Sequence, residues 1–233
     1  MTAPVASPMK LPSAREGRDG AAFVAVCALV ALVVAPGAGC APSRQRLVGP
    51  EARTAAMFFS SAADVSFPIR TSFSGIAELR GSTVPLVAGL SSRTASEETL
   101  GFYDPMGRAV LFLENDGGRI SVIRGPAAEE FPPGNVRPVD AGPVSLGRIL
   151  SGAPGYPVSG GETGRAADGG WVYAGRGQTL FSDPSRRLLS RAEYDISGKR
   201  VTVTYPGRDT PGPPRMVEVE VMGNRIVLRR DVE

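Results

Sequence analysis

LGFYDPMGRAVLFLENDGGRISVIR, residues 100–124, decides the fold of this chain of 233 residues. Two turn signals, DPMG at 104–107 and NDGG at 115–118, separate three runs that are rich in apolar residues. Asp, Asn, Pro and Gly favour tight turns, and Asp-Gly between two apolar runs is typical of a β-hairpin. The stretch therefore predicts three antiparallel strands in chain order, over residues 98–104, 108–114 and 119–124.

Candidate strands continue on both sides of this stretch. Residues 71–80 alternate apolar and polar side chains, the period of a half-buried strand, and residues 84–93 form a less regular candidate. Beyond residue 170 six more are predicted, over residues 171–174, 178–182, 188–195, 200–205, 215–222 and 225–230. A twisted sheet of about eleven strands tends to curl or split rather than stay open. We expect a mainly β (α+β) fold, a half-open and strongly curled antiparallel β-barrel with a helical lid.

Two short helices are expected beside the sheet. Pro50 stands ahead of an Ala-rich run, which predicts a helix over residues 51–63. Apolar residues recur at helical spacing over residues 143–150, which predicts a second helix. The segment 151–164 is rich in Gly, Pro and Ser and is predicted to be a mobile loop.

The first forty residues have the organisation of a bacterial lipoprotein signal. Basic residues precede an uncharged apolar run at 21–35, and Gly37, Ala38 and Gly39 precede Cys40. At that position the thiol would receive a lipid after cleavage. The run is shorter than the ~20 residues of a membrane-spanning helix, although an uncleaved anchor or a simple secreted protein stays an alternative. The predicted organisation is residues 1–39 as signal peptide, 40–50 as lipidated tether and 51–233 as one domain.

Composition excludes several classes of site. The chain has no His, so neither a Ser-His-Asp triad nor a His-based metal site is possible. Its two Cys, Cys27 and Cys40, both fall in the N-terminal segment, which leaves the domain without a disulfide or a Cys-rich zinc motif. The net charge of +3 comes from interspersed charges, so no basic stripe for nucleic acid is expected. No cofactor or metal is predicted.

Carboxylates are the remaining candidates for acid–base catalysis. Asp104, Glu114, Asp116 and the pair Glu129–Glu130 could supply two carboxyl groups, as in glycosidases. Most of them lie beside turns, where Asp favours local hydrogen bonds. We therefore expect a protein that is not an enzyme, with a carboxylate hydrolase as a minor alternative.

Five parts of the chain, in this order, resemble the Lol family, which comprises an outer-membrane lipoprotein receptor and its periplasmic carrier relative. They are FSGIAEL at 73–79, LGFYDPMGRAVLFL at 100–113, DGGRISV at 116–122, LGRILSGAP at 146–154, and the closing strands at 191–195 and 199–205 with a final hairpin. The resemblance covers roughly residues 50–233. It implies a half-open barrel closed by helices, with an apolar interior that holds the acyl chains of lipoproteins. The chain departs from the family in having a single Trp. Its best candidate for the family's membrane-touching loop is residues 86–90.

An apolar inner face of the curled sheet would bind acyl chains by buried area alone, at about 0.8 kcal/mol per methylene. The alternative is that the same residues fill an ordinary core. The predicted acyl-chain cavity consists of Phe73, Ala77, Leu79, Leu111, Leu113, Ile120, Val122, Leu146, Ile149 and Leu150. No charged residue needs to enter this face.

The predicted function is that of a lipid-anchored envelope protein. It would accept lipoproteins from a periplasmic carrier protein, bind their acyl chains and insert them into the outer membrane. Ala41 beside the Cys is not the Asp that commonly retains lipoproteins in the inner membrane, which by analogy places the protein on the periplasmic face of the outer membrane. A non-catalytic scaffold lipoprotein of the same fold is the alternative.

Overall fold

The computed structural model describes residues 45–79, 82–125 and 138–231. Within these residues, fourteen strands form one antiparallel sheet in the order β1-β8-β9-β10-β11-β12-β13-β14-β2-β3-β4-β5-β6-β7. The sheet is curled and is not closed, because β1 and β7 are its two ends. The predicted half-open antiparallel barrel is therefore confirmed, with three more strands than expected.

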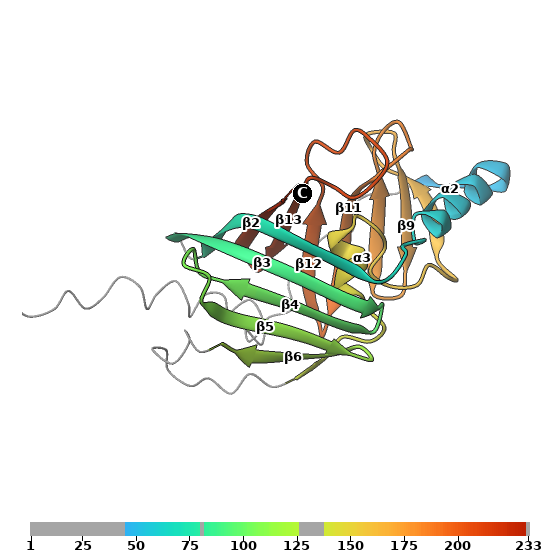
Figure 1. Ribbon diagram of the computed structural model, residues 1–233. Coiled ribbons are helices and arrows are strands. Elements are labelled where there is room, and N and C mark those ends of the chain that lie inside the picture. The colour runs from blue at the N-terminus through green and yellow to red at the C-terminus, as the bar shows by residue number, and fades with distance from the viewer. Residues whose placement is uncertain (1–44, 80–81, 126–137, 232–233) are drawn as a thin grey trace, which may run out of the picture.

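The strands from β2 to β6 form the predicted meander (Figure 1). Gly107, Gly117 and Gly118 have positive φ at 78°, 61° and 92°, so the two turns that the sequence signals use the conformation that glycine adopts without strain. The residues 86–90, expected as a membrane-touching loop, lie inside the third strand of the sequence instead. The strands are β2 (Ile69–Leu79), β3 (Ser82–Thr94), β4 (Glu97–Tyr103), β5 (Ala109–Asp116) and β6 (Arg119–Arg124).

The C-terminal strands form a second meander that joins the first. The last strand, β14, pairs with β2 along six residues, from Arg225 with Glu78 to Arg230 with Phe73. This pairing makes one continuous sheet from two halves that are far apart in the sequence. The strands are β9 (Trp171–Gly175), β10 (Gln178–Ser182), β11 (Leu189–Ile196), β12 (Lys199–Thr204), β13 (Met216–Val221) and β14 (Asn224–Arg230).

Three short strands were not expected. They are β1 (Gln45–Arg46), β7 (Val139–Asp140) and β8 (Glu162–Arg165). A strand of two to four residues shows too little alternation of apolar and polar side chains to be recognised in a sequence. These three strands form only because longer neighbouring strands offer a free edge. Since β1 pairs with β8, ordered sheet begins inside the segment 40–50 that was predicted as a tether.

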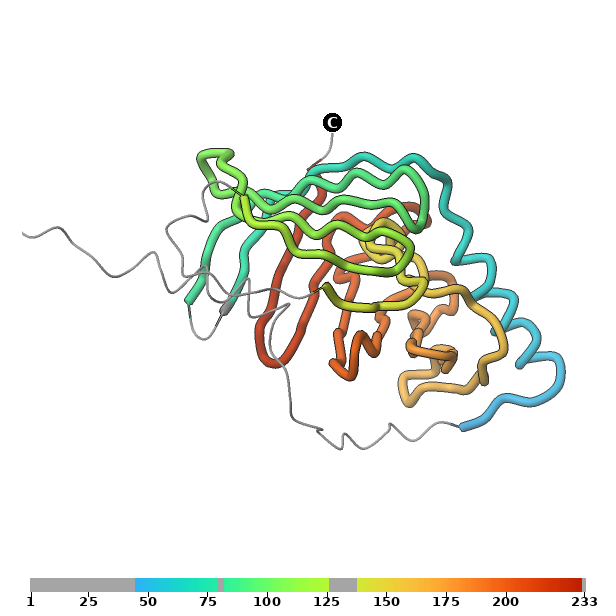
Figure 2. Tube along the Cα trace, turned by 90° about the horizontal axis from the view of Figure 1, so that it is seen from below, coloured from blue at the N-terminus to red at the C-terminus, as the bar shows by residue number. Residues whose placement is uncertain are grey.

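The two helices take different places on the sheet. The helix α2 (Gly49–Ser61) lies against β8 and β9 at one end of the sheet, with Ala55 and Phe59 buried. The helix α3 (Leu146–Leu150) contacts β3 and β4 and lies between the two halves of the curled sheet (Figures 1 and 2). The covering helix that the sequence predicts is therefore α3, which is shorter than the expected 143–150.

The segment after α3 is packed, where the sequence predicted a mobile loop over 151–164. Residues 152–156 are all buried. The backbone N–H of Gly155 donates to the Tyr194 hydroxyl at 3.1 Å, and the Gln178 side chain both donates to and accepts from the backbone of Tyr156. A Cβ on Gly155 would lie 2.8 Å from the Ile149 side chain. The small residues therefore serve close packing here, and composition alone cannot distinguish this use from flexibility.

Candidate functional site

The concave face of the sheet is mostly apolar, apart from one buried polar row of Ser92, Glu98 and Asn115. Partners across antiparallel strands point to the same face, so the register places residues of β2 to β6 side by side in rows. One row contains Phe73, Ala88, Phe102 and Leu111, and another contains Leu90, Leu100, Leu113 and Val122.

Nine of the ten residues predicted to line the cavity belong to one hydrophobic cluster. Six are buried, namely Phe73, Ala77, Leu111, Ile120, Ile149 and Leu150, and Leu113, Val122 and Leu146 are half-buried against them. The side chain of Leu79 lies outside what the structure describes. The residues from the sheet and those from α3 thus pack against one another, with α3 occupying the concave side.

The N-terminal end of α3 is held by a buried carboxylate that sequence analysis missed. Glu98 on β4 is only 4% exposed. It corrects the expectation that no charged residue enters this face, and it is tolerated there because hydrogen-bond donors surround it. Its Oε2 accepts the backbone N–H of Leu146 at 2.7 Å, and its Oε1 accepts that of Gly147 at 2.8 Å. Three side chains also donate to this carboxylate, Ser92, Asn115 and Ser145. Five donors around one carboxylate compensate for its burial.

The C-terminal end of α3 is held from the opposite half of the sheet. The Tyr205 hydroxyl donates to the carbonyl of Ile149 at 3.0 Å, and Arg230 donates to that of Leu150 at 3.1 Å. Arg208 donates to the carbonyl of Gly152 at 2.7 Å. The last carbonyls of a helix lack partners within it, and cations near them are favourable. A single turn of helix is therefore bonded at both ends, to both halves of the sheet.

Burial sets the protonation of the tyrosines around this segment. Burial raises the pKa of Tyr194 and that of Tyr205 well above the ordinary value of 10. Burial, together with Asp195 and Asp140, also raises the pKa of Tyr156. All three hydroxyls stay neutral at physiological pH and can hydrogen-bond to the backbone around α3.

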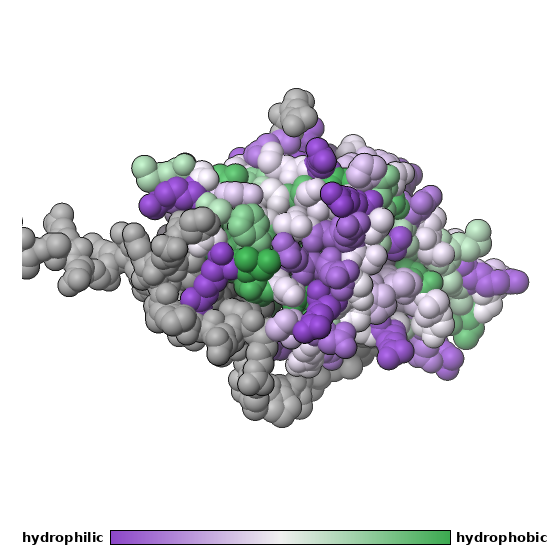
Figure 3. All heavy atoms as spheres, turned by 60° about the horizontal axis from the view of Figure 1, so that its bottom comes forward, coloured by the Kyte–Doolittle hydropathy of each residue, from purple (hydrophilic) through white to green (hydrophobic). Residues whose placement is uncertain are grey.

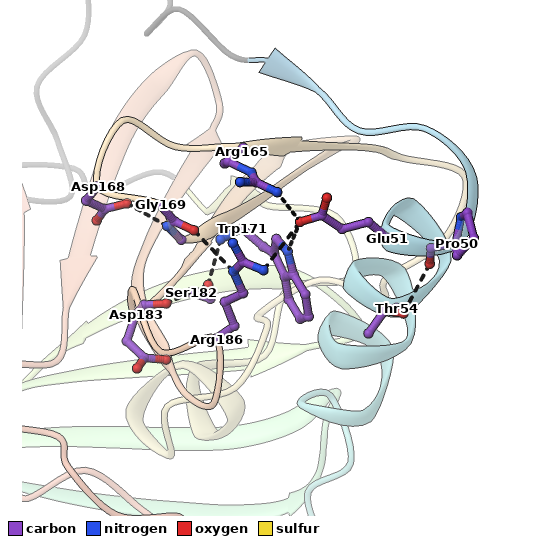
Figure 4. A network of polar contacts seen from close by, with 11 residues as sticks. Pro50, Glu51, Thr54, Arg165, Asp168, Gly169, Trp171, Ser182, Asp183 and Arg186 are labelled. Carbon is purple, nitrogen blue, oxygen red and sulfur yellow. Dashed lines mark hydrogen bonds and ion pairs between the residues drawn. The ribbon is translucent and has the colours of Figure 1, made fainter.

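A separate network attaches α2 to the sheet (Figure 4). The Glu51 carboxylate accepts from Arg165 at 2.5 Å and from the Trp171 indole at 3.4 Å, and Arg186 lies 3.4 Å away. The hydrogen bonds from Trp171 and Arg165 lower the pKa of Glu51 against a smaller opposing effect of desolvation. Trp171 is buried, as a core residue of the strand start, and its ring lies 5.8 Å from that of Phe58.

A pocket of about 640 Å³ opens between the end of α2, the segment after α3 and the C-terminal loops. We call it the mouth pocket. None of the ten predicted cavity residues lines it, and no sequence signal pointed to it because its walls come from five separate segments. Its lining consists of Phe58, residues 61, 62, 64–66 and 68–70, residues 151–153, residues 187–189, and Arg208, residues 211–213 and Arg230.

The structure keeps Asp104 away from Glu114, while Glu114 and Asp116 are two residues apart on one exposed face of β5, outside any buried site. Asp104 accepts from the backbone of Met106 and pairs with Arg108 at its own turn, while Glu114 is opposite Thr99 on β4. Five residues of strand, about 17 Å, separate Thr99 from Asp104, which is too far for a glycosidase pair. Glu129 and Glu130 lie outside the described residues. No cluster of acidic residues suited to a metal ion occurs in residues 45–79, 82–125 and 138–231.

The outer surface is mostly polar on the face shown in Figure 3, where hydrophobic residues gather only in small groups. Among the described helices, neither α2 nor α3 has the length and hydropathy needed to span a bilayer.

No protein-family model matches this chain, and no curated protein is significantly similar to it. Among solved structures, a LolA superfamily protein from Nitrosomonas europaea aligns with 78% of this chain and 91% of its own, at 13% identity and a TM-score of 0.46. A putative outer membrane lipoprotein-sorting protein domain from Vibrio parahaemolyticus has 9% identity over 78% of this chain and 91% of that one, with a TM-score of 0.45.

A third solved structure is similar to the same extent. It is a DUF1329 family protein from Desulfovibrio piger, with 11% identity over 77% of this chain and 91% of that chain and a TM-score of 0.44. Likenesses of this degree do not carry a function from those proteins to this one.

Proposed function

We propose that this chain is a lipid-binding envelope protein that holds acyl chains on the concave face of its sheet, under α3. One observation carries the proposal. The apolar interior of an unclosed sheet is covered by a single helical turn, which is attached to both halves through hydrogen bonds to side chains. Such a cover can move aside without breaking any strand pairing.

The free energies of the interactions allow an acyl chain to replace α3 on the concave face. Burying a chain of ~14 methylenes contributes about 11 kcal/mol at ~0.8 kcal/mol each. Hydrogen bonds to charged groups contribute about 1.5–3 kcal/mol each, so the bonds at one end of α3 are weaker than the gain from one buried chain. Acyl chains would thus displace α3 and take its place against residues of the sheet such as Phe73, Ala77 and Leu111.

The membrane anchor follows from Cys40, which lies outside the described residues. If its thiol is lipidated, the five residues up to Gln45 reach at most about 18 Å. The end of the sheet formed by β1 and β8 would then stay close to the outer membrane. In this arrangement the protein would accept lipoproteins from a periplasmic carrier and release them into the bilayer beside it.

The test begins with the full chain purified from membranes. Mass spectrometry should find a lipid on Cys40, absent from the Cys40→Ser variant, and co-purified acyl species. A fluorescent fatty acid should bind to the protein. Ala77→Phe should weaken this binding by at least tenfold, because the new ring fills the concave face. Ile76→Phe, on the convex face of the same strand, is the matched control. If the folded protein carries no acyl species and takes up no probe, the proposal is wrong.

A scaffold lipoprotein of the same fold is the second candidate. The observation that favours it is the close packing of α3 against the predicted cavity residues. A scaffold predicts that the Cys40→Ser variant retains a protein partner and that lipoprotein sorting is normal in a strain lacking this chain. Defective sorting in that strain would argue against the scaffold.

A further inference from the structure

The mouth pocket carries an excess of positive charge. Four arginines line it, Arg70, Arg187, Arg208 and Arg230, and Asp64 is the one carboxylate among its lining residues. Arg70, Arg187 and Asp64 are exposed, while Arg208 and Arg230 are half-buried. The two half-buried arginines are therefore the ones that water stabilises least.

Arg208 and Arg230 have no carboxylate partner among the described residues. Arg208 donates to the carbonyls of Gly152, Leu189 and Gly212, and Arg230 donates to the Thr71 hydroxyl and the Leu150 carbonyl. In contrast, the guanidinium of Arg225 pairs with Glu218 at 2.6 Å and with Glu78 at 3.4 Å. The mouth pocket thus contains two cations whose charge no side chain in the described part of the chain neutralises.

Both guanidinium groups also have donors left over. A guanidinium has five N–H donors, of which the contacts above use three on Arg208 and two on Arg230. In each the Nε atom is buried and has no hydrogen-bond partner among the described residues. Burial lowers the pKa of both groups, which is the effect expected when a charge is partly desolvated without a counter-ion.

Aromatic rings fix the orientation of these two side chains. The guanidinium carbon of Arg230 lies 5.3 Å from the centre of the Phe73 ring, and that of Arg208 lies 5.7 Å from the Tyr205 ring. Both distances are in the range of cation–π attraction. Two guanidinium groups held in place lose little side-chain entropy when they bind an anion.

We propose that the mouth pocket binds a phosphate group, with Arg208 and Arg230 as its principal cations and Arg70 and Arg187 at its rim. Guanidinium groups bind phosphate through paired N–H donors. A volume of about 640 Å³ is in the range of small-ligand sites. Apolar lining residues, among them Phe58, Ile69 and Leu189, would contact the glycerol and first methylenes of a phospholipid. Arg230 pairs with Phe73 and so lies at the edge of the concave face, but none of the ten predicted cavity residues lines the pocket. Phosphate binding can therefore be measured whether or not the concave face takes up acyl chains.

The test uses calorimetry on the full chain in nonionic detergent with three probes. They are inorganic phosphate, dihexanoyl phosphatidic acid and dihexanoylglycerol, which has the same chains without the phosphate. Phosphatidic acid should bind at least tenfold more tightly than dihexanoylglycerol. If inorganic phosphate binds as tightly as phosphatidic acid, the pocket is a site for free phosphate. If inorganic phosphate binds at least tenfold more weakly than phosphatidic acid, the pocket is a site for a lipid headgroup.

Variants locate the binding. Arg208→Gln and Arg230→Gln should each weaken phosphatidic acid at least tenfold, and Arg229→Gln, an exposed neighbour outside the pocket, should leave it unchanged. Because the first two also bond to the segment around α3, the double variant Arg70→Gln/Arg187→Gln provides a second measurement at exposed positions, with an expected loss of three- to tenfold. Equal binding of both lipids, or phosphate binding that none of these variants weakens, would overturn the proposal whatever the acyl-chain experiments find.

Discussion

Replacing Glu98 by Gln should release α3 from the sheet. The amide group has nearly the shape of the carboxylate, but its nitrogen can only donate. In the better orientation the nitrogen takes the place of Oε1, where Ser92 and Ser145 can turn their hydroxyls and accept from it. The backbone N–H of Gly147 cannot turn, so it loses its acceptor in a buried place.

The size of the effect follows from these contacts. One buried donor without a partner costs about 1–3 kcal/mol. The remaining hydrogen bonds also become weaker, because the negative charge of the carboxylate no longer strengthens them. Relief from burying a charge offsets some of this. We expect unfolding to become easier by about 2–4 kcal/mol, a large share of the ~5–15 kcal/mol of a typical domain.

Two measurements check this expectation. Urea denaturation should give the loss of stability, and hydrogen exchange at the amides of Leu146 and Gly147 should accelerate by about 30-fold or more, at about 1.4 kcal/mol per tenfold. The control is Glu97→Gln, next in the chain, whose exposed pair with Arg93 is worth at most about 1 kcal/mol. If Glu98→Gln has the stability and the exchange rates of the native protein, Glu98 does not hold α3 in place.

Three further predictions concern pH and packing. The Trp171 and Arg165 contacts hold the folded pKa of Glu51 below its ordinary 4.5. The stabilisation from these contacts is therefore present above pH 4.5 and is lost as the pH falls through the folded pKa. Trp171 fluorescence should report the release of α2, and Glu51→Gln should remove that transition. Because burial raises the pKa of Tyr194 and of Tyr205 above 10, the contribution of these neutral phenols to folding stability is present below pH 10 and falls as the pH rises further. Absorbance at alkaline pH should show these phenols ionising only on unfolding. Free ionisation in the folded protein would contradict their burial. Gly155→Ala should destabilise the fold by about 1–3 kcal/mol, since its Cβ would lie 2.8 Å from Ile149, whereas Gly89→Ala, with its nearest atom at 3.7 Å, should be neutral in thermal melting.

Local chemistry explains which parts of the fold could be predicted. The turns at 104–107 and 115–118 and the alternation over residues 71–80 are encoded within a few residues, and the hairpins they predict are present. The strands β1, β7 and β8 could not be predicted, because they depend on edges supplied by distant segments. The pairing of β14 with β2 is likewise invisible in either strand alone.

The candidate site shows the same division. Alternation assigns apolar residues to one side of each strand, which is why nine of the ten predicted residues belong to one hydrophobic cluster. Glu98 was missed because one Glu in a strand of mixed polarity is usually exposed, and only the distant helix turn of α3 explains its burial. The arginines of the mouth pocket were missed for a related reason, since Arg70, Arg187, Arg208 and Arg230 are far apart in sequence.

The position of β14 has a consequence for how the molecule is made. The strand β14 is near the middle of the sheet, between β13 and β2, so the two halves cannot join until residues 224–230 have been synthesised. Contacts between segments so distant in sequence form slowly. Loss of β14 would therefore split one sheet into two halves, each with an exposed edge.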